Sequence, residues 1–314
     1  MLKRFLTSIV IMAITIGFFA LRFVSPYIFD VFVLAMAVMS TYEVCKAYND
    51  SNRKNDWIVV MAYPILFFVL GFLTIFFKLS ILFFLAMIFA LVVLLFVVCI
   101  CINKFSKSKI NKEMVEVGYK KSYKSYVMHK SILDLFLMIY PTILIGGLSV
   151  INNIANFVAI PSDYAQIAGM FVLVMTFVTT IATDTFAYLI GRGIGGKKLC
   201  PTISPNKTIS GAIGGLLFSV LFSVCLFLVF GIMSSYRAMF SNCNISIWTC
   251  LVYGIVASII SQLGDIFASL IKRKNGIKDY GNIFPGHGGV LDRIDGLCFN
   301  AFLTAILALI VFAI

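Results

Sequence analysis

Charged residues are scarce in this chain. Only 12% of its 314 residues are Asp, Glu, Lys or Arg, whereas a soluble domain carries about 25%. Apolar residues make up 61% of the sequence, and the mean hydropathy is +1.04. They occur in runs of about 18 residues or more, the length needed to cross a bilayer core of roughly 30 Å. The composition therefore excludes a soluble globular protein and predicts a polytopic membrane protein.

Three further absences narrow the interpretation. The eight cysteines form no C-x-x-C pair, so we interpret them as small apolar residues in reduced surroundings. No A-x-A cleavage site follows the first apolar run, which predicts an uncleaved anchor rather than a signal peptide. The chain also has no linker rich in Pro, Gly or Ser and no internal repeat. The division of the chain into regions must therefore be inferred from the positions of its polar and charged residues.

The apolar runs predict an all-α, polytopic helical membrane protein with about nine transmembrane helices. Backbone polar groups cannot stay unpaired in lipid, and these runs are too long and too uniformly apolar for the strands of a membrane barrel. The expected spans are 5–24, 27–45, 57–77, 79–101, 132–151, 166–191, 211–233, 246–271 and 297–314.

Lys and Arg fall almost entirely on one side of these spans. All but three of the 25 lie at the N-terminus or in alternate loops, the exceptions being Arg22, Lys78 and Arg237. This is the positive-inside pattern, and it predicts a cytoplasmic N-terminus and an external C-terminus. It also assigns the net charge of +12 to membrane topology rather than to nucleic-acid binding.

The polar chemistry divides the chain into two expected regions. Residues 1–131 form a membrane scaffold of four spans, ending in a basic cytoplasmic loop, 104–131, rich in lysine. That loop either attracts an anionic leaflet, at about 1 kcal/mol per near-surface cation, or only sets the topology. Residues 132–314 form the catalytic region, with cytoplasmic loops at 192–210 and 272–296.

Two aspartates lie inside apolar runs of the catalytic region. Asp184 is in the sixth expected span and Asp265 in the eighth. A carboxylate at that depth costs about 2.5–3.5 kcal/mol on insertion scales and is normally paired or lines a polar cavity. A purely structural carboxylate bonded to a neighbouring helix is the alternative. Asp265, Ser269 and Lys272 share one helical face, which favours a functional role for Asp265.

The loop 272–296 collects cations, aspartates and glycines. Asp292 and Asp295 are three residues apart, so both carboxylates point to one side if this segment is helical. Carboxylates beside Lys and Arg are suited to Mg²⁺, which then bridges substrate phosphates. The sequence PGHGG leaves backbone N–H groups accessible to an anion. His287, between its glycines, either contacts phosphate, handles a proton or is simply solvated.

The loop 192–210 is a second cationic segment. Its formal G-x-G-x-x-G follows a membrane helix rather than a strand, so it is no dinucleotide fingerprint. We expect a flexible loop that carries Lys197, Lys198 and Lys207, followed by Gly211 and Gly215, which favour close helix packing. Together, the two loops and the aspartates beneath them predict a polyphosphate site at the membrane surface, suited to phosphoryl or nucleotidyl transfer.

The stretch 269–295 resembles the signature of the CDP-diacylglycerol synthases, or phosphatidate cytidylyltransferases. That signature runs S-x-apolar-K-R, four residues, K-D, a small residue, P-x-H-G-G and D-R-apolar-D. It is filled without a gap by Ser269, Lys272, Arg273, Lys278, Asp279, Gly281, Pro285, His287, Gly288, Gly289, Asp292, Arg293 and Asp295. DTFAYLIGR, SPNKT and the odd span count also resemble the family. Ser210 departs from it, since glutamate usually stands there.

The resemblance implies that a phosphatidate oxygen attacks the α-phosphorus of CTP, giving CDP-diacylglycerol and pyrophosphate. It implies Mg²⁺ as cofactor, with a second, monovalent cation such as K⁺ as an option. The implied metal ligands are Asp265, Asp292 and Asp295, with Asp184 as a further candidate. The implied catalytic residues are these first three with Lys272, Arg293 and His287. Substrate binding is implied for Ser204, Lys207, Ser269, Arg273, Lys278, Gly288 and Gly289.

Two other classes of protein stay open at this point. A related membrane enzyme, such as a polyprenol kinase or an ether-lipid cytidylyltransferase, would use similar chemistry on another lipid. A transporter would explain intramembrane aspartates but not the glycine-rich cationic loop. The D-G-x-x-A-R pattern of CDP-alcohol phosphotransferases is absent. The expected partners are CTP, phosphatidate and membrane lipid, with a homodimer as an option. In a bacterium the expected location is the plasma membrane, with the site on the cytoplasmic side.

Overall fold

Helices dominate the structure, a computed structural model that describes residues 2–51, 53–120, 122–158, 160–284 and 288–313, with backbone only for residues 2–8, 11, 162 and 313. In the part of the chain that it describes, the strands form one two-stranded sheet. Eight described helical segments have the length and apolar composition of membrane spans: 26–50, 57–76, 81–105, 123–152, 165–193, 209–232, 247–274 and 291–312. The expected class, an all-α polytopic membrane protein, is confirmed.

The first expected span falls on α1 (Leu2–Leu21). Its described apolar part, Met12–Leu21, is shorter than the other eight segments. The count of nine spans and the cytoplasmic N-terminus therefore stay predictions.

The segment with the most apolar window is also the least buried of the eight. α4 (Ile81–Phe105) contains a window with a mean hydropathy of 3.4, of which only 11% is buried. Leu82 and Phe89 on this helix are 75% and 72% exposed. Because a contiguous apolar surface of this kind marks contact with protein or membrane, α4 has the surface of a lipid-facing helix.

The chain forms two compact units, Met1–Leu144 with Lys274–Asp292, and Ile145–Arg273 with Arg293–Ile314. The expected division of the chain at residue 131 into scaffold and catalytic regions rests on chemistry and stays a prediction.

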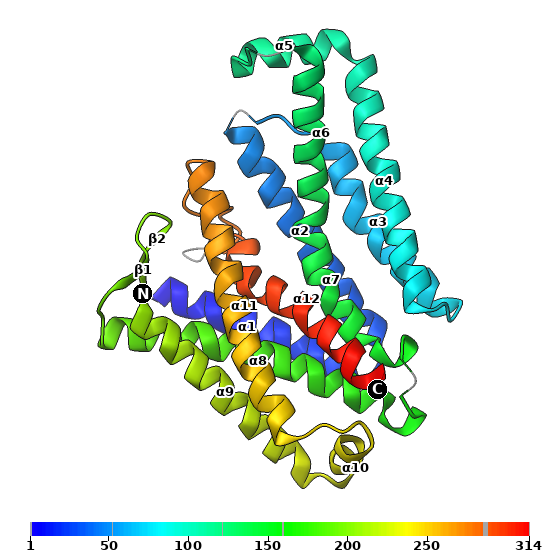
Figure 1. Cartoon of the computed structure of the whole chain (residues 1–314), viewed down its shortest axis with the longest axis vertical. Coiled ribbons are helices and arrows are strands. Elements are labelled where there is room, and N and C mark those ends of the chain that lie inside the picture. Colours follow the sequence, from blue (N-terminus) through cyan, green and yellow to red (C-terminus); the bar gives the residue numbers. More distant parts are fainter. Residues whose placement is uncertain (1, 52, 121, 159, 285–287, 314) are drawn as a thin grey trace. The chain divides into compact units, whose positions relative to one another are not determined.

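The first unit contains the helices up to the start of α7. It also contains the segment between α11 and α12, which carries most of the signature and is called the motif loop below. Its remaining helices are α2 (Pro26–Asp50), α3 (Trp57–Phe76), α5 (Lys107–Val117) and α6 (Tyr123–Ile139). Pro26 occupies the first turn of α2, where its missing N–H costs no hydrogen bond. The short helix α5 lies across one end of α4 and α6 (Figure 1).

Most of the expected basic loop 104–131 is helical. α5 ends at Gly118, whose φ of 67° suits a left-handed helix cap. α6 then begins at Tyr123, where the Ser122 side chain accepts a hydrogen bond from the Ser125 N–H. Ile110 packs with Tyr126 and Val127 in a buried cluster. This apolar contact between α5 and α6 is what orders the segment.

The second unit contains the rest of α7 (Thr142–Asn152) and the later helices. These are α8 (Ala165–Gly193), α9 (Ile209–Ile232), α10 (Ser234–Asn242), α11 (Ile247–Lys274) and α12 (Leu291–Ala313), with short 3-10 helices η1 (Ile154–Asn156) and η2 (Ser162–Tyr164). α8 and α9 lie side by side (Figure 1). A Cβ on Gly211 would lie 2.5 Å from the Ala187 carbonyl oxygen, and one on Gly215 would lie 2.7 Å from that of Thr183. The predicted role of these two glycines in close helix packing is confirmed.

The expected flexible loop between α8 and α9 is a β-hairpin, which corrects the prediction. β1 (Lys198–Cys200) pairs antiparallel with β2 (Ser204–Thr208), with Lys198 opposite Thr208. The Thr208 side chain then accepts from the Gly211 N–H at 3.1 Å and begins α9. Ladder hydrogen bonds and this helix cap hold the segment in one conformation, and so fix the direction of Lys207.

Candidate active site

The α11 face predicted from spacing carries the first part of the site. Ser269 Oγ donates to Asp265 Oδ1 at 3.5 Å, so these two residues share a helical face as expected. Lys207, on β2, forms an ion pair with Asp265, with 2.6 Å between Nζ and Oδ2. Both side chains are only partly exposed, at 24% and 34%. The hairpin thus carries a cation to an aspartate inside a membrane helix.

Two more carboxylates of the same unit join Asp265. Asp184 on α8 and Asp295 on α12 both interact electrostatically with Asp265 and with each other. Asp295 is buried, at 9% exposed, whereas the Asp184 side chain is exposed. Each carboxylate comes from a different helix. Convergence of this kind predicts a site rather than three separate structural contacts.

Cations of the same unit surround these carboxylates. Asp184 interacts with Lys207 and Arg293, and Asp295 interacts with Lys272. Opposite charges in a partly buried setting attract strongly. Three carboxylates and three cations therefore form one polar cluster, in which neither sign of charge is left in isolation.

Glycines bring α11 and α12 close together at this cluster. A Cβ on Gly264 would lie 2.8 Å from both the Asp295 carbonyl oxygen and the Phe299 ring. A Cβ on Gly296 would lie 2.6 Å from Ser261 Oγ. Because real Cβ atoms do not approach other heavy atoms so closely, only glycine permits this spacing of the two helices. Asp265 follows Gly264 and Asp295 precedes Gly296. The close spacing of the two helices therefore brings these two aspartates together.

The arrangement of carboxylates is open rather than tight. Among the described residues, only Asp56, Cys99 and Asp134 place three candidate ligand atoms within 4.8 Å of one another. The oxygens of Asp184, Asp265 and Asp295 are more widely spaced than that. Mg²⁺ is usually bound through one or two carboxylates together with waters and substrate phosphates. Hard oxygen donors at this wider spacing, beside lysine and arginine side chains, fit such an ion.

In the other unit, the motif loop is held by two buried carboxylates. Asp292 Oδ2 accepts from the N–H groups of Tyr280, at 2.8 Å, and Gly289, at 2.9 Å. Glu43 Oε1 and Oε2 accept from the N–H groups of Val290 and Leu291, at 2.8 and 2.9 Å. Asp292 and Glu43 are 8% and 2% exposed. The two carboxylates fix the end of the loop and the start of α12.

Glu43 also explains why the helix begins where it does. The first N–H groups of a helix have no partner within the helix, and a carboxylate there is stabilised by the helix dipole. α12 therefore starts at Leu291, six residues before the expected start of the last span at 297. Asp292 and Asp295 consequently lie on the first turns of a helix, which was the condition for both carboxylates to point to one side.

Glu43 was missed by the sequence analysis, which assigned its span to the scaffold. The available signal was its place inside the apolar run 27–45, which holds two carboxylates, Asp30 and Glu43. Gly281 and Gly289 both abut its carboxylate and leave no room for a Cβ. Gly288 has a φ of +87°, a conformation in which a side chain is strained. The glycines predicted to bind substrate thus also let the loop close around Glu43.

The remaining predicted residues lie in varied places. Arg273 is exposed, and its Nε donates to the Ile203 carbonyl oxygen of the hairpin at 3.3 Å. Ser204 begins β2, and Lys278 is exposed. Ser210 Oγ, at the position where the resemblance predicts glutamate, donates to the Gly195 carbonyl oxygen and so links the start of α9 to the glycine-rich segment. His287, with 285 and 286, lies outside the described residues.

Comparison with known proteins identifies the class. The model described as "Cytidylyltransferase family" matches residues 2–311. The chain therefore belongs to the cytidylyltransferase family, which confirms the predicted resemblance. A nucleotidyltransferase family of this kind points to a divalent metal, in agreement with the carboxylate cluster.

Particular relatives share part of the chain. It is similar to the phosphatidate cytidylyltransferases of Staphylococcus haemolyticus strain JCSC1435, 43% identical, and Staphylococcus saprophyticus subsp. saprophyticus strain ATCC 15305, 40% identical. That of Staphylococcus aureus strain COL is also 40% identical. Each alignment spans 131 residues, which is 42% of this chain and 46% of the relative. The aligned part is thus slightly less than half the length of these relatives.

Proposed function

We propose that this protein is a phosphatidate cytidylyltransferase, acting at the cytoplasmic face of a bacterial plasma membrane. The observation that supports the proposal most is the cluster of Asp184, Asp265 and Asp295 with Lys207 and two further cations in one unit. The family match and the names of the relatives agree with it. One substrate is a lipid and the other is water-soluble, which suits a polar cluster among membrane helices.

In the proposed reaction, a phosphate oxygen of phosphatidate attacks the α-phosphorus of CTP. The bond from that phosphorus to the oxygen of the β-phosphate breaks, and pyrophosphate leaves as CDP-diacylglycerol forms. The nucleophile is already an anion at neutral pH, so no strong base is needed. Lys207, Lys272 and Arg293 offset the repulsion between the two anionic substrates and stabilise the leaving group.

Asp265 and Asp295 are the proposed ligands of Mg²⁺, with Asp184 as a further one. The ion, when bound, supplies positive charge that stabilises the phosphate oxygens as negative charge develops on them. Asp292 holds the motif loop through Oδ2, and its direct ligation of the metal stays a prediction. Substrate contacts by Ser269, Arg273, Lys278 and the loop glycines are proposed on the same basis.

The proposal is tested with CTP labelled either at the α- or at the γ-phosphate. Purified protein in detergent with phosphatidate and Mg²⁺ should transfer the α-label to lipid and release the γ-label as pyrophosphate. Transfer of the γ-label to lipid would instead identify a lipid kinase, and no transfer of either would refute both.

Asp265→Asn serves as the matched variant in this assay. It keeps the side-chain shape but removes the charge that pairs with Lys207, so we expect turnover to fall by orders of magnitude with expression unchanged. Near-native activity of this variant across a Mg²⁺ titration would exclude Asp265 as a ligand.

A further inference from the structure

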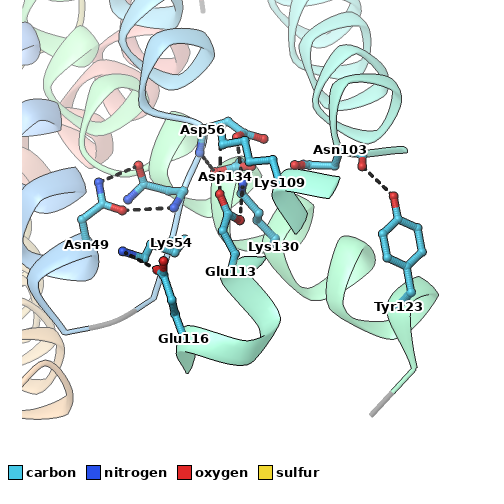
Figure 2. Close-up of polar contacts among 11 residues, drawn as sticks. Asn49, Lys54, Asp56, Asn103, Lys109, Glu113, Glu116, Tyr123, Lys130 and Asp134 are labelled. Atoms are coloured by element: carbon cyan, nitrogen blue, oxygen red, sulfur yellow. Dashed lines mark hydrogen bonds and ion pairs between the residues drawn. The ribbon is translucent and has the colours of Figure 1, made fainter. Parts of the chain in front are cut away.

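A buried ionic cluster lies in the first unit, where α3, α4, α5 and α6 meet, and the proposed reaction makes no use of it. At its centre, Lys130 is 2% exposed. Its Nζ lies 2.9 Å from Asp56 Oδ1 and 3.0 Å from Glu113 Oε2. Asp134, also fully buried, accepts from the Asp56 N–H at 2.8 Å through Oδ1. Figure 2 shows these side chains converging: Lys130 and Asp134 from α6, Glu113 from α5, and Asp56 from the residue before α3.

The charges of this cluster do not balance. Three carboxylates, those of Asp56, Glu113 and Asp134, face one buried ammonium. Lys109, at 3.9 Å from Glu113, is largely exposed and contributes little. Removing carboxylates from water without compensation is costly. The excess negative charge in the buried part therefore requires either protons or a cation.

Two carboxylate oxygens mark where that cation would bind. Each of Asp56 and Asp134 uses Oδ1 in the contacts above, and Oδ2 of each is buried without a hydrogen-bond partner among the described residues. Buried polar atoms of a folded protein are nearly always paired. Since a carboxylate oxygen of Asp56 and one of Asp134 also lie within 4.8 Å of each other, the two unpaired oxygens point to a ligand between these side chains.

The Cys99 thiol completes this volume. Cys99 is fully buried, and its Sγ lies within 4.8 Å of carboxylate oxygens of both Asp56 and Asp134. We propose that Asp56, Cys99 and Asp134 bind a divalent transition-metal ion of the zinc type, which fastens α3, α4 and α6 together.

The donor set selects the class of ion. Mg²⁺ and Ca²⁺ take oxygen ligands, whereas a thiolate favours Zn²⁺ and similar ions, which also accept carboxylates. An ion with bonds of roughly 2.0–2.3 Å needs donor atoms that lie close together, and these three lie within 4.8 Å of one another. Because the bound thiol is deprotonated, two positive charges would reduce the excess of negative charge around Lys130 from two to one. Since the ligands come from α4, α6 and the residue before α3, the ion binds only when these elements have packed, and so it stabilises the folded unit.

The test uses the full chain in detergent, stripped of metal with a chelator and kept in excess Mg²⁺ to fill sites built from oxygen alone. Co²⁺ is the probe, because a cobalt–thiolate bond gives a charge-transfer absorption band. We expect one equivalent of Co²⁺ to produce the band and Zn²⁺ to abolish it by displacement. Zn²⁺ should also raise the thermal midpoint of the protein.

Cys99→Ala should lose the band and the Zn²⁺-dependent rise in thermal midpoint. Cys250→Ala is the matched control, since Cys250 is also buried but belongs to the second unit, and it should keep both. Because Cys99 takes no part in the proposed reaction, cytidylyl transfer by Cys99→Ala reports that this variant is folded.

Two results would overturn the proposal. One is the absence of the band in the unmodified protein, which by itself would show that protons, not a metal, compensate the carboxylates. The other is an equal band in Cys99→Ala and in Asp134→Asn, which would place the cobalt at another thiol.

Discussion

Glu43→Gln tests whether a residue of the second helix positions the catalytic motif. The glutamate accepts hydrogen bonds from the Val290 and Leu291 N–H groups with both oxygens. Glutamine keeps one acceptor, but its amide nitrogen would face the other N–H. Hydrogen bonds to charged groups contribute about 1.5–3 kcal/mol. Losing one such bond should therefore lower the ratio of molecules with the motif loop held at Glu43 to molecules with the loop released by roughly 10- to 150-fold.

The assay combines transfer of the α-label from CTP to lipid with proteolysis of the motif loop. We expect turnover to fall by about the same 10- to 150-fold, and the loop around 276–284 to be cut faster. The thermal midpoint in detergent shows whether the whole protein is destabilised. Glu116→Gln is the matched control: this glutamate is 62% exposed in its ion pair with Lys54, so its change should leave both readouts unaffected.

One outcome would refute the reasoning directly. If Glu43→Gln has native turnover and a loop no more sensitive to protease, the carboxylate is not what holds the motif. If turnover falls only in proportion to a lower thermal midpoint, Glu43 is a general structural residue and not a positioning one.

Three further predictions follow from the second unit and the topology. Lys207→Ala should raise KM for CTP or lower kcat, because it removes the ion pair of 2.6 Å with Asp265. Lys120→Ala, in the α5–α6 connection, should change either constant little, and equal losses in the two variants would mean that only the total basic charge matters. Gly264→Ala should cost about 1–3 kcal/mol by overpacking and separate α11 from α12, with lower turnover, and native activity would show that their spacing is not critical. In a cysteine-free background, a cysteine replacing exposed Asn282 should react with an impermeant thiol reagent only after the cells are opened. A cysteine replacing exposed Ser241 should react in intact cells, and the reverse pattern would exclude a cytoplasmic site.

Sequence patterns predicted the features that depend on residues close together in the chain, such as the membrane helices and the face of α11. Long, uniformly apolar runs form helices in lipid, so the helical class and the approximate positions of most spans could be predicted from hydropathy. The spacing of Asp265 and Ser269 placed both on one face because a helix repeats every 3.6 residues. The hairpin was missed because its order comes from two short paired strands and the Thr208 cap, in a segment whose glycines predicted flexibility.

The contacts that hold the motif could not be predicted in the same way. Glu43 and Leu291 are 248 positions apart, and nothing in either neighbourhood specifies the other. The same holds for Asp56 and Asp134, separated by 78 positions, and for Cys99 between them in sequence. Glu43, Cys99 and Asp134 each lie in an apolar run, where insertion energetics makes a charged group costly. That cost is itself the usable signal: a buried ionisable group needs a partner, and only the packing of the helices identifies which partner it has.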